Sequence, residues 1–196
     1  MNESLTSKLN CLINILKDEN YFKRENIANE VPFYIFDYNP EDELEVRKTI
    51  NQISESKQIK YNVEILNLYD IAINYLQENN LLEKTFEIEK KFTPEKFFTR
   101  LKSIIDPELI LNKIVKISVT KEPDILILTG IGNIYPILRA HLIINKLQEK
   151  IYNKTVILMY PGTFEIIDTE GQLLLFNKLE SKAFYRAFKI CGGGVR

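Results

Sequence analysis

Short apolar segments that alternate with helix-like segments constrain the fold of this chain most strongly. DILILT (residues 124–129) and KTVILMY (residues 154–160) are almost continuously apolar. Such runs are typical of strands that are buried on both faces of a parallel sheet. Between them, IYPILRAHLIINKLQEK (residues 134–150) has helical periodicity, and we expect it to form one helix. The order predicts a strand, a crossover helix and a second parallel strand.

The first third of the chain repeats this alternation. Apolar positions at helical spacing predict a first helix, and VPFYIF (residues 31–36) and NVEILNL (residues 62–68) predict two strands. Asn39-Pro40-Glu41 combines a cap residue, a proline and an acid, which predicts a helix to about Ser56. Asn67 is suited to cap the helix that follows the second strand. KAFYRAFKI (residues 182–190) predicts a final strand.

The middle of the chain changes character. Thr93-Pro94-Glu95 and Asp106-Pro107-Glu108 repeat the helix-start signal and predict two successive helices. Pro161-Gly162 and residues 168–171 are predicted as turns. We therefore expect a single α/β domain over residues 1–196, with a largely parallel central sheet of about five strands flanked by helices. A helical segment, roughly residues 81–120, is inserted in the middle.

Composition excludes several classes of function. Lysine plus arginine (26) nearly balances aspartate plus glutamate (27), so we expect no direct binding to nucleic acid. Cys11 and Cys191 have no companions at metal-ligand spacing, and the sequence indicates neither a zinc site nor a disulfide framework. The N-terminal segment lacks the pattern of a secretory signal, and the longest apolar run is broken by Arg139 and His141. These features predict a cytoplasmic protein without a membrane span.

The loop Thr129-Gly130-Ile131-Gly132-Asn133 is the strongest candidate for a ligand site. It follows a predicted buried strand and precedes a predicted helix, which is the setting in which backbone amides bind phosphate. It has no lysine followed by serine or threonine, and no third glycine at dinucleotide spacing. We therefore favour a tight turn or a protein-contact loop, with nucleotide or phosphate binding through Thr129, Gly130, Gly132 and Asn133 as the alternative.

No catalytic constellation is visible in the sequence. His141 is the single histidine, which excludes a Ser-His-Asp triad and a multi-histidine metal site. We expect it in the core or in an interface, and Arg139 on the surface. Asp37, Asp70 and Thr129 follow predicted strands, and the carboxyl ends of parallel strands commonly hold ligands. Capping or turn roles explain the two acids equally well, so we expect no enzymatic activity, no metal and no cofactor.

Six segments of the chain, in order between about residues 30 and 190, resemble the BrxB family of the BREX bacteriophage-exclusion systems. They are FDYNPEDELEVRK (36–48), ILNLYD (65–70), ILTGIGNIYPILRAH (127–141), NKLQ (145–148), MYPGTF (159–164) and AFYRAFKI (183–190). The resemblance implies a bacterial defence component without an established enzymatic activity. It implies a noncatalytic adapter that binds the alkaline-phosphatase-like protein PglZ, and possibly further BREX components.

A protein interface generally presents aromatic and arginine side chains as anchors. Tyr135, Arg139, Tyr185 and Arg186 are candidates for such anchors in this sequence. Ordinary packing within the fold explains each of them, taken singly, at least as well. The alternative to an adapter is a degenerate nucleotide- or phosphate-binding sensor that uses the loop from Thr129 to Asn133.

Overall fold

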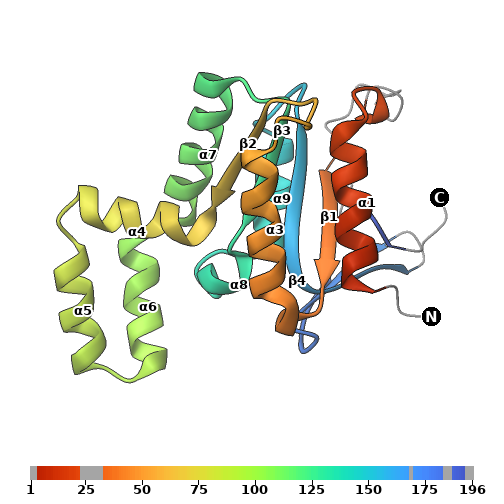
Figure 1. Cartoon of the computed structure of the whole chain (residues 1–196). Coiled ribbons are helices and arrows are strands. Elements are labelled where there is room, and N and C mark those ends of the chain that lie inside the picture. The colour runs from red at the N-terminus through yellow and green to blue at the C-terminus, as the bar shows by residue number, and fades with distance from the viewer. Residues whose placement is uncertain (1–3, 23–32, 168–169, 183–186, 193–196) are drawn as a thin grey trace.

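The computed structural model describes residues 4–22, 33–167, 170–182 and 187–192. Its centre is a sheet of parallel strands in the order β2-β3-β4-β1-β7, with helices on both faces (Figure 1). The predicted fold class is confirmed. The five strands are β1 (Phe33–Tyr38), β2 (Val63–Asn67), β3 (Ile125–Thr129), β4 (Thr155–Ile167) and β7 (Ala187–Lys189).

Two hydrophobic cores lie on the two faces of the sheet because alternate side chains of each strand point to opposite faces. In β1, Tyr34 and Phe36 belong to the core beneath α1 (Leu5–Lys17) and α3 (Glu43–Glu55). Phe33 and Ile35 belong to the core of the opposite face. The helices of that face are α4 (Leu68–Glu78), α7 (Pro107–Lys121), α8 (Ile131–Ile134) and α9 (Ala140–Gln148).

Side-chain caps explain where several helices begin, as the sequence predicts. Asn39 accepts a hydrogen bond from the Glu41 amide at the start of a short 3-10 helix, η1 (Pro40–Asp42), which leads into α3. Asn67 accepts from the Tyr69 amide at the start of α4. Asp106 caps α7 in the same way. Each cap satisfies a backbone amide that has no partner within its helix.

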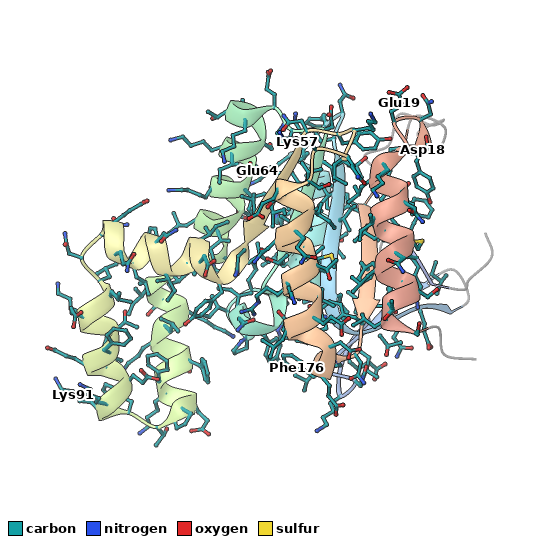
Figure 2. All side chains as sticks on the ribbon, viewed as in Figure 1. Asp18, Glu19, Lys57, Glu64, Lys91 and Phe176 are labelled. Carbon is teal, nitrogen blue, oxygen red and sulfur yellow. A yellow bond between two sulfur atoms is a disulfide. The ribbon has the colours of Figure 1, made fainter. Side chains whose placement is uncertain are left out.

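The helical segment predicted in the middle of the chain has two different parts. α5 (Leu82–Lys91) and α6 (Pro94–Ile104) form a hairpin that extends away from the sheet beyond α4 (Figure 1). Lys91 marks its far end (Figure 2). α7 instead packs on the sheet through Ile110, Leu111 and Ile114. In the described part of the chain, no helix is long and apolar enough to span a membrane.

The prediction of one helix over residues 134–150 is wrong. α8 ends at Ile134, and α9 begins only at Ala140. Tyr135 has extended backbone angles (φ −63°, ψ 139°) because the ring of a following proline, here Pro136, disfavours the helical conformation of the residue before it.

The predicted turn at Pro161-Gly162 is also wrong, because both residues lie within β4. The strand leaves the parallel sheet there and pairs with β5 (Glu170–Leu175), which in turn pairs with β6 (Leu179–Lys182). A Cβ atom at Gly162 would lie 2.1 Å from the carbonyl oxygen of Leu174, so only glycine permits this close approach. Of the other predicted turn, residues 168 and 169 lie outside the described residues.

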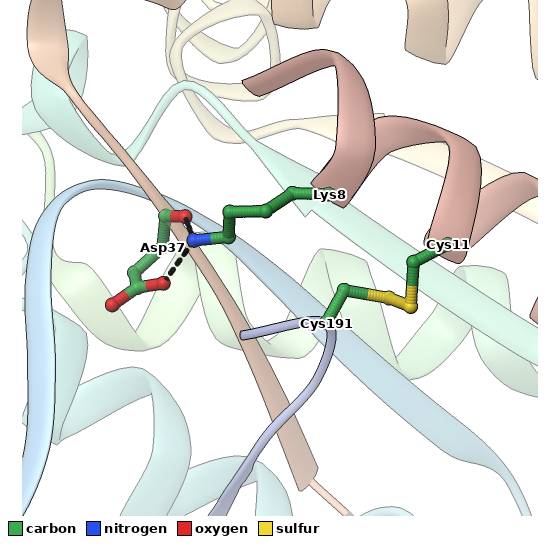
Figure 3. The surroundings of a disulfide bond; sticks show 4 residues. All are labelled: Lys8, Cys11, Asp37 and Cys191. Atoms are coloured by element: carbon green, nitrogen blue, oxygen red, sulfur yellow. Dashed lines mark hydrogen bonds and ion pairs between the residues drawn. A yellow bond between two sulfur atoms is a disulfide. The ribbon is translucent and has the colours of Figure 1, made fainter. Parts of the chain in front are cut away.

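Cys11 and Cys191 form a disulfide bond, so the expectation that the cysteines form no such link is wrong (Figure 3). Their Cα atoms lie 5.8 Å apart although they are separated by 180 positions in the sequence. Sequence spacing gives no sign of this pair, because only the fold brings the end of β7 beside α1. The bond links the N-terminal helix to the last described strand.

Reduction of this disulfide is expected to lower the free energy of unfolding by about 5 kcal/mol, because the bond closes a long loop and restricts the unfolded chain. Urea unfolding with and without a reductant measures the effect. A Cys11→Ser variant serves as the control, since its stability should equal that of the reduced parent and should not respond to the reductant. An unchanged parent on complete reduction would contradict this contribution.

Candidate functional site

The glycine loop, residues 129–133, spans the end of β3 and the start of α8, as the sequence predicts, but its glycines are explained by packing. Gly130 has a φ of +75°, and a Cβ atom there would lie 2.2 Å from Oδ1 of Asn67. A Cβ atom at Gly132 would lie 2.8 Å from the ring of Phe176, which is labelled in Figure 2. The loop therefore sits directly against the end of β2 and against the β5–β6 connection.

Several amides of this loop are already used within it. The amides of Asn133 and Ile134 both donate to the carbonyl oxygen of Gly130 at 3.1 Å. α8 has four residues, so its dipole is small compared with that of a long helix. These contacts favour the interpretation of the loop as a tight turn. Binding of a phosphate or nucleotide by this loop stays a prediction.

Of the predicted interface residues, Tyr135 and Arg139 come together in the turn between α8 and α9. The guanidinium carbon of exposed Arg139 lies 5.8 Å from the centre of the half-buried Tyr135 ring, within the range of a cation–π contact. His141 is half-buried, and burial together with the charge of Arg139 lowers its pKa. Tyr185 and Arg186 lie outside the described residues.

Asp37, at the carboxyl end of β1, is the centre of a buried charge cluster (Figure 3). Its carboxylate lies 2.5 Å from Nζ of Lys8 and 2.7 Å from Nζ of Lys189. It also accepts a hydrogen bond from the Phe164 amide at 3.1 Å. The carboxylate thus joins α1, β4 and β7 at one point of the sheet.

The environment of Asp37 favours its charged form. Burial acts to raise the pKa of the carboxyl group, but the hydrogen bonds from Lys189, Lys8 and the Phe164 amide outweigh it and lower the pKa from its ordinary value of 3.8. Because every one of these contacts is internal, the geometry supports a structural role for this acid.

A groove runs along the free edge of β2. β2 pairs with β3, and within the described ranges no strand pairs with its other side. The groove has a volume of about 740 Å³. α3 forms one wall and α4 with α7 forms the other, and Glu64, labelled in Figure 2, lies between them.

Apolar and polar side chains together line this groove. The apolar lining comes from Ile50, Val63, Ile65, Leu66, Ile71 and Ile117. The polar lining comes from Arg47, Asn51, Ser54, Glu64, Asn67, Asp70, Asn74, Glu78, Lys113 and Thr129. Asp70 and Thr129, both singled out in the sequence, therefore share one site, while Asp37 belongs to the separate charge cluster on β1.

Most of the groove residues could not be predicted from the sequence. α3, α4 and α7 each contribute only one lining residue every few positions, so no continuous motif marks the groove. One signal was present. NVEILNL contains a glutamate among its apolar residues, whereas DILILT and KTVILMY are almost continuously apolar. A polar side chain within a strand of a parallel sheet indicates an edge position.

The fold and the groove define a three-layer α/β protein with an open, helix-flanked edge strand. The model of a family described as BREX protein BrxB matches residues 64–190. A curated BREX protein BrxB of Bacillus cereus is 28% identical over 192 residues, covering 95% of this chain and 97% of its own length. A BREX protein BrxB of Escherichia coli is 27% identical over 175 residues, covering 89% and 86%.

This chain belongs to the BrxB family. Membership implies a component of a BREX phage-defence system, as the sequence resemblance predicted. No solved structure matches the chain.

Substitution of Gly130 by alanine is expected to lower the free energy of unfolding by about 2 kcal/mol, from backbone strain and from displacement of the Asn67 cap. The measurement is urea unfolding of this variant in the parent and in an Asn67→Ala background. The second background lacks the cap, so the same substitution should cost about 1 kcal/mol there. Equal costs in both backgrounds would refute the contact between Gly130 and Asn67.

Replacement of Asp37 by asparagine is expected to cost about 3 kcal/mol at neutral pH, because two partly buried lysines lose their counter-charge. The folded-state pKa of Asp37 is lowered, so its contribution is complete above pH 3.8 and is lost as the pH falls through that lower pKa. The parent should therefore lose stability more steeply than the variant in acid. Parallel acid dependences in urea unfolding would contradict a stabilising Asp37 carboxylate.

Proposed function

We propose that this protein is a noncatalytic adapter of a BREX system that acts in the cytoplasm and binds PglZ. Family membership supplies the defence system. The observation that carries the adapter role is the groove beside β2, because it offers a formed surface of the kind that proteins use to bind one another. Its lining of apolar and polar side chains is consistent with the composition of such surfaces.

The charged groups of the groove support binding to a partner. Nζ of Lys113 lies 3.2 Å from the carboxylate of Glu78, and both residues line the groove. Glu64 also lines the groove, and its carboxylate lies 2.6 Å from Nζ of Lys121. These charges can orient a partner.

The turn between α8 and α9 offers a second contact surface for the same partner. Arginine and aromatic residues are frequent anchors of protein interfaces, and here the exposed Arg139 lies over the Tyr135 ring. This surface and the groove are both connected to the glycine loop, since Thr129 lines the groove and α8 follows Gly130.

Co-expression with the PglZ protein of the same BREX system tests the proposal. We expect both proteins to elute as one defined complex in size-exclusion chromatography with light scattering. Two separate peaks at micromolar concentrations would count against PglZ as the partner and would direct the same experiment to the other BREX proteins.

Charge reversal at Arg139 is expected to weaken the PglZ complex by roughly tenfold or more, while the melting temperature stays nearly the same. The physical reason is the loss of an exposed arginine anchor that supports little of the fold. Titration calorimetry measures the affinity, and thermal unfolding measures the stability. Lys91→Glu, a charge reversal at another exposed residue, at the far end of α5, is the matched control and should bind like the parent.

A loss of binding together with a large drop in melting temperature would instead assign Arg139 to the fold. Unchanged binding would remove the α8–α9 turn from the interface.

A further inference from the structure

We propose that the free edge of β2 binds its partner by strand addition: an extended segment of the partner, with both apolar and polar side chains, pairs with β2 and extends the sheet. The inference rests on the proposed adapter function and names how that function is carried out. Main-chain hydrogen bonds would supply affinity, and the groove walls would select the side chains.

The backbone of β2 has hydrogen-bonding groups that face the groove. In a parallel pair, alternate residues of a strand direct their amide and carbonyl groups to the same neighbour. The Ile125 amide donates to the carbonyl oxygen of Asn62 at 3.2 Å, and Val63 is aligned with Ile125. Asn62, Glu64 and Leu66 therefore face β3, which leaves the backbone groups of Val63 and Ile65 directed into the groove.

The helices form a slot around this edge. Side chains of α3 on one side and of α4 and α7 on the other line a common space of about 740 Å³. Both helical layers thus extend past β2, as they would if another strand lay beside it. The partial exposure of β2 agrees with this description: only Leu66 of its five residues is buried, whereas four of the five residues of β3 are.

The walls define the chemistry of the segment. Ile50, Val63 and Ile65 lie on the α3 side, and Leu66, Ile71 and Ile117 lie on the α4–α7 side. Polar side chains stand beside these apolar residues on both sides, such as Ser54 of α3 and Lys113 of α7. Because side chains of an added strand alternate between the two sides, both sets of its residues would meet a mixed apolar and polar surface. A run of about five residues that combines β-branched and polar side chains fits these walls.

The slot favours an extended segment over a second copy of this chain. Pairing of two β2 edges would require them to approach to about 4.8 Å. In each copy the edge is recessed between α3 and the α4–α7 layer, so the projecting helices of the two copies would meet first. A single extended segment has no such layers and can enter the slot.

Hydrogen exchange at single-residue resolution tests strand addition in the complex with PglZ. In the free protein, the amides of Glu64 and Leu66 should exchange slowly and those of Val63 and Ile65 rapidly. In the complex, the amides of Val63 and Ile65 should become protected by at least tenfold. The amide of exposed Tyr152, which precedes β4, two strands away from β2, is a reference that should not change.

Two variants at one position separate backbone pairing from side-chain packing. Ile65→Pro removes a groove-facing amide at an edge, where proline is tolerated, and should weaken binding by roughly tenfold or more. Ile65→Ala removes a wall contact but keeps the amide, and should weaken binding by only a few-fold, clearly less than Ile65→Pro. Equal weakening by both variants would overturn strand addition in favour of side-chain packing.

The outcomes distinguish this inference from the proposed function. A complex that forms while Val63 and Ile65 still exchange rapidly overturns strand addition and leaves the adapter role in place. Absence of any complex overturns both for this partner. Protection of Val63 and Ile65 in a dimer of the isolated chain would overturn the proposal in favour of pairing between two copies.

Discussion

The parallel sheet requires cover on both faces, and the rest of the structure depends on that requirement. β1 is buried at every one of its residues, so apolar side chains project from it in both directions. Exposing either face to water would cost the hydrophobic free energy of a whole core. α1 and α3 cover one face, and α4, α7, α8 and α9 cover the other. Helices connect successive parallel strands, and these connections place helices on both faces of the sheet.

The same requirement produces the groove. Helices are wider than strands, so a helical layer on each face extends beyond the last strand of the sheet. At β2 the two layers leave a slot whose floor is a strand edge, and edges with free backbone groups are sites where proteins pair with other chains. The proposed assembly of this BREX component with a partner rests on this edge.

Two contacts link the N-terminal helix α1 to the β7 side of the sheet. Asp37 joins Lys8 of α1 to Lys189 of β7, and Cys11 joins the same helix to Cys191. Removing the Asp37 charge would leave the positive charges of two partly buried lysines without a counter-charge. Both contacts lie at the β7 end of the sheet, so the fold is secured away from the proposed binding edge.

Local signals in the sequence determined the strands and most helix starts. The side chains of Asn39, Asn67 and Asp106 cap amides that are two residues away in the sequence. The continuous apolar runs of β3 and β4 indicate that both strands are buried. Tertiary structure alone decided the Cys11–Cys191 bond, the path of β4 through Gly162, and the groove. Each of these joins residues far apart in the chain, and the free energy of such contacts depends on strand order and helix placement, which periodicity and capping do not encode.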